Sequence, residues 1–135
     1  MIVLDTSVVV PAFASWHEAH RRVVARLADE PSIPVQVAIE TYSVLTRLPH
    51  PHRVPGAIVA AYLDRVFPED RRIPLPGELH GDMPQRCAGL GIEGGAIYDA
   101  VVAATALAHD ATLVTRDHRA MPTYRLIGAR TERLD

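Results

Sequence analysis

The sequence predicts an α/β fold with a mainly parallel central sheet flanked by helices. Two observations lead to this prediction. Short apolar runs, such as residues 2–4 and 111–115, are separated by longer segments whose apolar residues recur at helical spacing. The length of 135 residues and a hydrophobic content of 48% suit one domain with a sizeable core. We therefore expect a single domain over residues 1–135.

The first half of the chain is expected to begin with a strand at residues 2–4. Thr6 or Ser7 can cap a short helix that runs to Phe13. A helix over residues 17–30 follows, with Val23, Val24, Leu27 and Ala28 on one face. Residues 32–35, which follow Pro31 and include Pro34, predict a brief strand, and residues 36–48 have helical spacing. The segment 49–55, PHPHRVP, predicts a rigid loop.

The second half is expected to add three helices and three strands. Helices are predicted over residues 56–67, 77–91 and 96–110. Residues 71–75 predict an edge strand, because Pro74 cannot donate a backbone hydrogen bond to a neighbour. Residues 111–115 form the clearest later strand, and residues 124–129, YRLIGA, are expected to form the last one.

Composition excludes several classes of protein. The net charge of −2 is unlike that of a protein that coats DNA nonspecifically. No apolar stretch approaches the roughly 20 residues of a membrane span, and Asp5 interrupts the apolar start that a signal peptide would need, so we expect a cytoplasmic protein with no membrane partner. The single cysteine, Cys87, is expected to be a buried structural thiol.

Four acids are expected at one edge of the sheet. Asp5 and Asp117 follow strands directly, whereas Glu40 and Asp99 fall early in helices. Since the carboxyl ends of parallel strands and the starts of the following helices meet at one edge, the four side chains can converge there. Clustered carboxylates repel one another unless a cation neutralises them, and oxygen ligands suit Mg²⁺ or Mn²⁺. Such a site can activate water for attack on phosphorus.

Simpler interpretations of these residues remain open. Glu40 and Asp99 can act only as acids that favour a helix dipole, and Asp5 and Asp117 can cap the next helix. Arg116 and His118 can contact a phosphate group or only solvent. The histidines at 17 and 20 lack the i, i+4 spacing of a zinc protease, so we expect surface histidines.

The residues together resemble a PIN domain, and in particular a VapC-type toxin of bacterial toxin–antitoxin pairs. The matching pieces are IVLDTS at the start, ETYSVLTRL around Glu40, and YDAVVAATALAHDATLVTRD near the end. The resemblance covers essentially the whole chain. It implies a PIN fold and a Mg²⁺- or Mn²⁺-dependent ribonuclease that is restrained by a cognate antitoxin and is usually a homodimer.

The resemblance also implies roles for individual residues. Asp5, Glu40, Asp99 and Asp117 would be its catalytic and metal-binding acids, and Thr6 and Thr115 would support the metal. One departure is visible, because many relatives have an aromatic residue shortly after the last acid, where this chain offers Met121. Phosphatases of the haloacid-dehalogenase type and response-regulator receivers also place acids at strand ends, but both rely on a lysine, and this chain contains none.

The expected function is therefore that of an endoribonuclease, the toxin of a type II pair, which hydrolyses RNA with a metal-activated water. Arginines at the rim, including Arg116, would bind flanking phosphates. The alternatives are a housekeeping RNA-processing nuclease of the same fold and a non-catalytic binding module. Exposed members of an apolar set are expected to form a groove for an antitoxin helix. That set is Val8, Val9, Phe13, Trp16, Ile58, Tyr62 and Val66.

Overall fold

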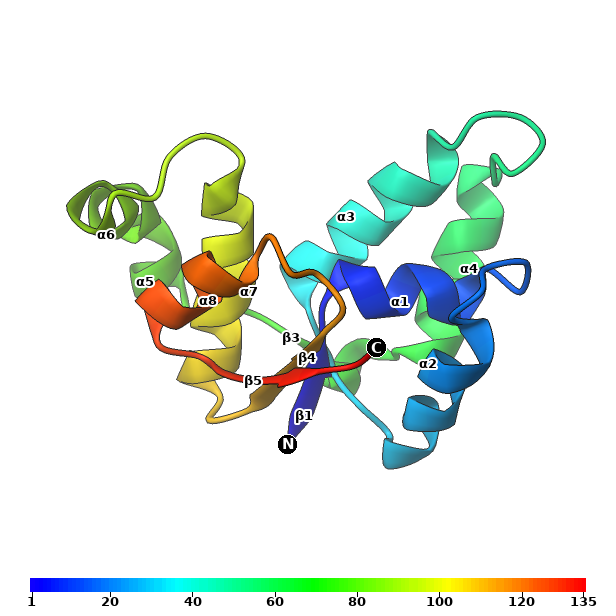
Figure 1. The fold of residues 1–135 in the computed structure, drawn as a ribbon, viewed down its shortest axis with the longest axis horizontal. Helices are drawn as coiled ribbons and strands as arrows, with labels where there is room; N and C mark the ends of the chain where they lie inside the picture. The colour runs from blue at the N-terminus through cyan, green and yellow to red at the C-terminus, as the bar shows by residue number, and fades with distance from the viewer.

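The computed structural model describes residues 1–135 and has a three-stranded parallel sheet at its centre (Figure 1). Its order is β1 (Ile2–Leu4), β4 (Thr112–Thr115), β5 (Arg130–Arg133), with Leu4 opposite Val114 and Thr115 opposite Arg133. The strands β2 (Ile33–Pro34) and β3 (Arg72–Ile73) form a second parallel pair. A bridge between Val3 and Ser32 connects this pair to β1. The predicted α/β fold with a parallel sheet is confirmed.

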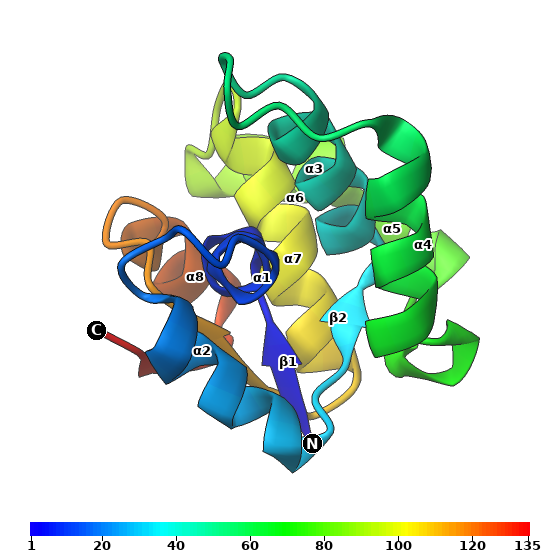
Figure 2. The same ribbon diagram turned by 90° about the vertical axis from the view of Figure 1, so that its right-hand side faces the viewer.

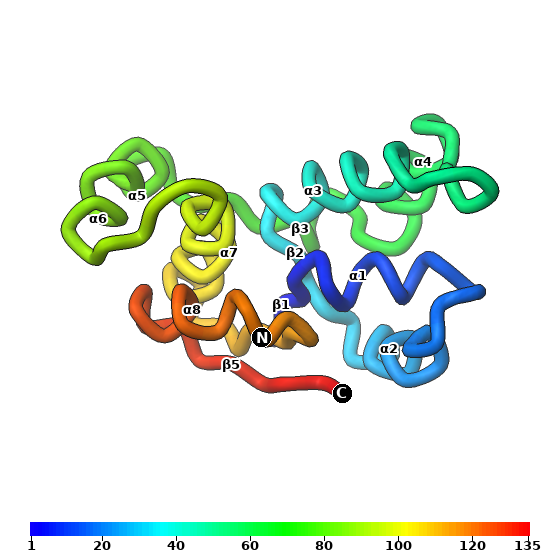
Figure 3. Tube along the Cα trace, turned by 45° about the horizontal axis from the view of Figure 1, so that its top comes forward, coloured from blue at the N-terminus to red at the C-terminus, as the bar shows by residue number.

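Helices flank the strands in two groups, α1–α4 on one side and α5–α8 on the other (Figures 1 and 3). Their bounds are α1 Thr6–Phe13, α2 His20–Arg26, α3 Val35–Thr46, α4 Gly56–Val66, α5 Gly77–Gly81, α6 Met83–Leu90, α7 Ala96–Ala108 and α8 Met121–Ile127. Single 3₁₀ turns cover Leu27–Asp29 and Glu69–Arg71. No helix has the length and apolar character needed to span a membrane.

The buried core surrounds β1, β4 and α7. Every residue of α7 from Ala100 to Ala106 is buried, and most of them are alanine or valine, which lets neighbouring elements approach the helix closely. β1 leads directly into α1, which Figure 2 shows end-on above the strand. The carboxyl ends of β1 and β4 therefore open onto the starts of α1 and of the loop before α8, where a site is expected in a parallel sheet.

The prediction for the end of the chain is wrong. Residues 124–129 were expected to form a strand, but residues 121–127 are the helix α8 and the strand is Arg130–Arg133. Tyr124 and Ile127 are buried at i, i+3 spacing, and Gly128, at φ 96°, ends the helix in the left-handed conformation. The strand RTER gave no apolar signal because it lies at the sheet edge with its side chains mostly in solvent.

Two helix predictions also need correction. The expected helix over residues 77–91 is two helices, α5 and α6, because Pro84 is tolerated only in a first turn and a new helix starts at Met83. The expected helix over 17–30 begins only at His20, and Val24 is exposed instead of sharing the buried face of Val23.

Candidate active site

Three hydroxyl groups surround the buried carboxylate of Asp5, which follows β1 and is only 3% exposed. Ser7 Oγ donates to Oδ1 at 2.5 Å, Tyr124 Oη donates to Oδ2 at 2.8 Å, and Thr115 Oγ1 also donates to Oδ2. We call Ser7, Thr115 and Tyr124 the hydroxyl cage. A carboxylate has about four acceptor positions. The cage occupies three of them, which leaves one position, on Oδ1, for another ligand.

The hydroxyl cage explains how this sequence tolerates an acid at the end of a buried strand. Burial raises the pKa of Asp5, and the hydrogen bonds from Ser7, Thr115 and Tyr124 lower it in part. The N-cap position of α1 is Asp5, so Thr6 and Ser7 lie within the helix, and the expectation that one of them caps it is wrong. The Asp5 side chain makes no capping hydrogen bond. The Ser7 hydroxyl is committed to Asp5 instead.

The cage also fixes the loop between β4 and α8. The backbone N–H of Arg116 donates to Ser7 Oγ at 2.7 Å, and that of Asp117 donates to Thr115 Oγ1 at 3.0 Å. Asp117 Oδ1 then accepts from the N–H groups of Arg119 and Ala120 at 2.9 and 3.3 Å. Asp117 therefore stabilises its own loop with one oxygen and keeps Oδ2 without a hydrogen bond.

Glu40 and Asp99 approach from α3 and α7. Glu40 is held at both oxygens, by Thr6 Oγ1 at 3.0 Å and by Gln36 Nε2 at 3.1 Å. It is the sixth residue of α3 and lies in its second turn, where a helix dipole has little effect, so an interpretation through the dipole alone is disfavoured. Asp99 lies in the first turn of α7, as expected, and its carboxylate receives no hydrogen bond from the protein.

The pKa of Asp99 is affected by the other three acids. Burial, together with the negative charges of Glu40, Asp117 and Asp5, raises the pKa of Asp99 to about 6, while Arg119 lowers it. Desolvation is the largest of these contributions, and the three carboxylates add to it because like charges close to Asp99 disfavour its ionised form. The acids therefore act on one another as a single cluster.

A trough runs over this cluster and consists of two adjoining hollows. The first, of about 500 Å³, contains Glu40 and Asp99 together with Arg47 and Tyr98. The second, of about 370 Å³, contains Ser7, His17, Arg116 and Asp117. Both are lined by Thr6, Val44 and Arg119, which join them. We call the joined hollows the acidic trough. His17 was expected to be only a surface histidine, but it lines the trough.

Arginines stand along the trough without strong acidic partners. The Arg119 side chain is 94% exposed and its only ion pair is a long one of 3.8 Å to Asp117. Arg116 Nε is buried and has no hydrogen-bond partner. Arg47 forms no ion pair. The trough thus combines carboxylates at its floor with guanidinium groups that are free to bind an anion, which suits a phosphodiester.

The donor set fits a hard divalent cation. No three acidic or histidine side chains lie in ligand geometry around one point, so the carboxylates do not form a closed cage in advance. Mg²⁺ keeps several waters and commonly uses only one or two protein carboxylates. Asp99 has both oxygens free and a pKa raised by burial and by the neighbouring carboxylates, and Asp5 has one free acceptor position. Asp99 and Asp5 can therefore supply the one or two carboxylates that such a cation commonly uses.

Sequence reasoning missed two members of the site, Ser7 and Tyr124. Ser7 carried a signal, because a second hydroxyl two residues after Asp5 can fold back onto it. Tyr124 carried none, since it was placed in a strand. Met121, which occupies the position of the expected aromatic, is buried, and Tyr124 lies one turn further along α8 and points to Asp5.

The Tyr124 hydroxyl can be tested separately from its ring. We expect Tyr124→Phe to lower the free energy of unfolding by about 1–3 kcal/mol, because a buried carboxylate loses a donor, and to weaken Mn²⁺ binding by about 10- to 100-fold, as is typical when an outer partner of a metal ligand is lost. Tyr62→Phe is the matched control, because the Tyr62 hydroxyl is buried without a partner. Urea denaturation in EDTA and Mn²⁺ titration measure both effects. Equal destabilisation in the two variants would contradict the assignment.

Comparison with known proteins gives consistent matches. The family described as "PIN domain" matches residues 2–125. Ribonuclease VapC40 of Mycobacterium tuberculosis (strain ATCC 25618 / H37Rv) is 42% identical over 132 residues, which covers 98% of both chains. Ribonuclease VapC27 of the same strain is 41% identical over 128 residues, which covers 94% of this chain and 92% of that protein.

Solved structures show the same fold. The crystal structure of FitAcB from Neisseria gonorrhoeae has a TM-score of 0.68 at 20% identity and covers 97% of this chain and 96% of that one. The crystal structure of VapBC2 from Rickettsia felis, bound to a DNA fragment from their promoter, has a TM-score of 0.68 at 19% identity, with both chains covered in full. At this level of identity the structures establish a shared fold.

Proposed function

The chain belongs to the PIN domain family, and from this premise we propose that it is a metal-dependent endoribonuclease and the toxin of a type II toxin–antitoxin pair. The observation that carries the proposal is the cluster of Asp5, Glu40, Asp99 and Asp117 beneath a trough with free arginines. Relatives at 41–42% identity that are named ribonucleases support it.

Each residue of the site has a proposed role. Asp5 and Asp99 would hold the cation, since they have free acceptor positions. When bound, Mg²⁺ or Mn²⁺ supplies charge stabilisation at phosphorus and lowers the pKa of a water. Glu40, fixed at both oxygens by Thr6 and Gln36, would accept a hydrogen bond from the attacking water and orient it.

The remaining residues would position the substrate. The cage hydroxyl of Thr115 fixes both Asp5 and the amide of Asp117, so it supports the acids without contacting RNA. Asp117 would hold the loop that presents Arg116 and Arg119, and these arginines, with Arg47, would bind the phosphates on either side of the cut.

Two alternative functions remain distinct from this proposal. A housekeeping RNA-processing nuclease would use the same acids but would need no antitoxin. A non-catalytic binding module is disfavoured by Asp99, whose pKa of about 6 reports an acid kept in an unfavourable environment. Such a cost to stability is typical of residues retained for activity.

Removal of divalent cations tests the proposed activity directly. We expect purified protein to cleave RNA with Mg²⁺ or Mn²⁺, to lose cleavage in EDTA, and to recover it when Mn²⁺ is added in excess. Gel analysis of labelled RNA is the measurement, with heat-denatured protein as the control for contaminating nuclease. Full cleavage in EDTA would refute a role for the acids in holding a cation.

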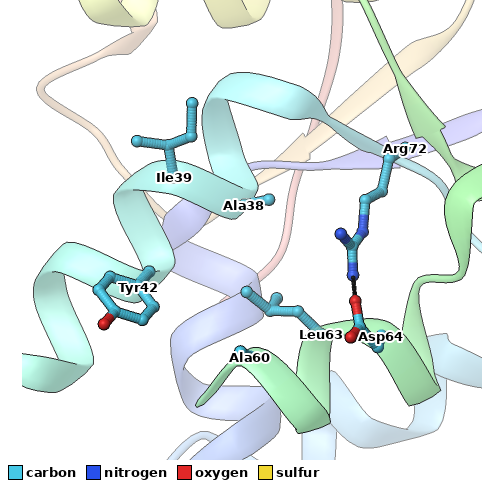
Figure 4. A pocket seen from close by; sticks show the side chains of 7 residues that line it. All are labelled: Ala38, Ile39, Tyr42, Ala60, Leu63, Asp64 and Arg72. Carbon is cyan, nitrogen blue, oxygen red and sulfur yellow. Dashed lines mark hydrogen bonds and ion pairs between the residues drawn. The ribbon is translucent and has the colours of Figure 1, made fainter. Parts of the chain in front are cut away.

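We also propose that the chain forms a homodimer through an apolar face on α3, α5 and α7. Its exposed members are Val35, Ile39, Tyr42, Leu79 and Tyr98. The face borders on the hollow of about 280 Å³ between α3 and α4 in Figure 4, where Ile39 and Tyr42 stand on one wall and Leu63 of α4 on the other. Exposed apolar area of this kind is typical of a protein interface, and a twofold axis lets one face pack against its own copy.

Ile39→Glu tests the dimer, because it places a charge at the centre of this face. We expect light scattering to give the mass of two chains for the wild type and of one chain for Ile39→Glu. Ile58→Glu is the matched control, since Ile58 is also more than half exposed but lies on α4 outside the face. A wild type with the mass of one chain would contradict the dimer.

We propose that the antitoxin binds to the surface on which Ile58 of α4 is exposed. Of the apolar set expected to form its groove, Val8, Val9 and Tyr62 are buried, Phe13 and Val66 are partly buried, and Trp16 and Ile58 are exposed. The groove is therefore smaller than expected.

Growth arrest on expression, relieved by co-expression of the product of a neighbouring reading frame, would distinguish the toxin from the housekeeping nuclease.

A further inference from the structure

Two loops meet in an aromatic stack at one end of the molecule. The loop between α1 and α2 carries Trp16, and the loop between α3 and α4 carries His52; both loops lie at the same end of the fold (Figures 1 and 3). The two rings are stacked, with centroids 4.0 Å apart and an angle of 27° between their planes. Trp16 is 49% exposed and His52 is exposed as well. A flat aromatic surface is therefore presented to solvent.

This aromatic stack continues from the acidic trough. His17, the neighbour of Trp16, lines the trough together with Arg116 and Asp117, and its ring centroid lies 6.1 Å from that of Trp16. Val10 and Pro11 of α1 line the same hollow between His17 and Ser7. The floor thus follows α1, whose eight residues span about 12 Å, from the acids toward the stack. That distance exceeds the spacing of one nucleotide step, roughly 3.4 Å in a stacked strand.

The charges along this path favour a nucleic acid strand. The segment from Thr41 to Leu63 contains Arg47, Arg53, His50 and His52 and has no acid. Neither Arg47 nor Arg53 forms an ion pair. The backbone N–H of Ala19 donates to Nδ1 of His17 at 3.0 Å, so the proton of the neutral ring is on Nε2, which is free to donate to a phosphate. An aromatic surface interleaved with such groups is typical of single-strand recognition.

We propose that the Trp16–His52 stack is a binding site for one unpaired base of the RNA substrate, more than one nucleotide from the cleaved bond. The inference rests on the proposed ribonuclease function and adds to it a contact with one base away from the cleaved bond. Bases in a duplex are stacked on their neighbours and cannot reach the Trp16 ring, whereas an unpaired base can be splayed out onto it. The guanidinium groups along the trough hold the phosphates between that base and the acids.

Trp16 is the only tryptophan in the chain, so its fluorescence reports on this site alone. We expect a mixed-sequence single-stranded RNA to quench Trp16 emission in a saturable way, and the same RNA annealed to its complement to quench it far less. The titration uses the full chain with Asp99→Asn, so that the RNA is not cut. Unchanged emission at RNA concentrations that saturate binding would overturn the inference.

Variants connect the signal to affinity. We expect Trp16→Ala to weaken single-stranded RNA binding, measured by fluorescence anisotropy of labelled RNA, by about 5- to 150-fold, and Trp16→Phe, which keeps a flat ring, to weaken it by less. His52→Ala should weaken binding and His52→Phe should restore most of it. Leu126→Ala removes an exposed apolar side chain from α8 and is the control for nonspecific effects.

The outcomes separate this inference from the proposed function. Wild-type affinity in Trp16→Ala, with RNA cleavage intact in the Trp16→Ala chain that keeps Asp99, overturns the stacking site and leaves the ribonuclease proposal standing. A wild-type chain that neither binds nor cleaves RNA overturns both. Quenching by single-stranded RNA together with loss of affinity in Trp16→Ala supports both.

Discussion

Asp99→Asn is expected to abolish RNA cleavage and, in the absence of divalent cations, to make the protein more stable. Both effects come from the negative charge of Asp99. The reaction needs this charge, but the partly buried surroundings and the neighbouring carboxylates destabilise it. Asp99 receives no hydrogen bond from the protein, and burial together with the charges of Glu40, Asp117 and Asp5 raises its pKa to about 6 from an ordinary value of 3.8. Asparagine keeps the shape and removes the charge.

The sign of the pH dependence follows from this shift. Because the folded protein binds the Asp99 proton more tightly than the unfolded chain does, this residue contributes most stability below pH 3.8, and that contribution is lost as pH rises through about 6. After allowance for partial solvent screening, the charged form costs about 1–2 kcal/mol at neutral pH. Asp99→Asn should therefore raise the melting temperature at pH 7.5 by about 4–8 °C and leave it nearly unchanged at pH 4.

Thermal unfolding in EDTA at the two pH values measures this difference. Mn²⁺ should raise the melting temperature of the wild type and have little effect on Asp99→Asn, since the cation relieves the same repulsion. Asp110→Asn is the matched control. Asp110 is exposed, is held by Arg130 at 2.7 Å outside the trough, and has a left-handed backbone that asparagine tolerates. Cleavage by Asp99→Asn, or equal melting temperatures at pH 7.5, would contradict the assignment of Asp99.

The sequence was informative where apolar periodicity and buried structure coincide. Residues 2–4 and 111–115 are mostly apolar because β1 and β4 are buried, and Asp5 and Asp117 lie just past the carboxyl ends of these two paired strands. The position of β5 in the sequence could not be predicted, because an edge strand such as RTER is held by backbone hydrogen bonds that form with almost any side chains. The break between α5 and α6 depends on one proline in a segment that otherwise has helical spacing.

The candidate site was predictable in its acids and not in its donors. Acids next to strand ends are rare enough to be noticed, whereas a tyrosine 119 residues away from its partner acid has no local signal. The function of Tyr124 depends on the orientation of α8 against β1, which is a property of tertiary packing. The stack of Trp16 on His52 is similar, because it joins two loops that are 36 residues apart in the chain.

The chemistry of the cut ends is expected to show water as the nucleophile. Metal-free ribonucleases use acid–base groups to drive the 2′-hydroxyl of the substrate onto phosphorus, which leaves a cyclic phosphate. That route needs an acid and a base at the scissile bond. His17 is the only histidine that lines the acidic trough, and His20 and His109 are engaged with backbone carbonyls of Pro11 and Pro74. The carboxylates instead favour attack by water, with departure of the 3′-oxygen.

We therefore expect a 5′-phosphate and a free 3′-hydroxyl at every cut. Cleaved RNA should be ligated directly through its 5′ end without prior kinase treatment, and the 3′ fragment should carry one phosphate by mass spectrometry. A single 2′-deoxy sugar at the cut site should slow cleavage by less than about 10-fold, because the 2′-hydroxyl then contributes only to recognition. The matched control is the same deoxy sugar one position away. Attack by water does not use the 2′-hydroxyl of the sugar at the cut. Cyclic phosphate ends, or complete protection by the one deoxy sugar at the cut, would therefore refute water attack at the site formed by Asp5, Glu40, Asp99 and Asp117.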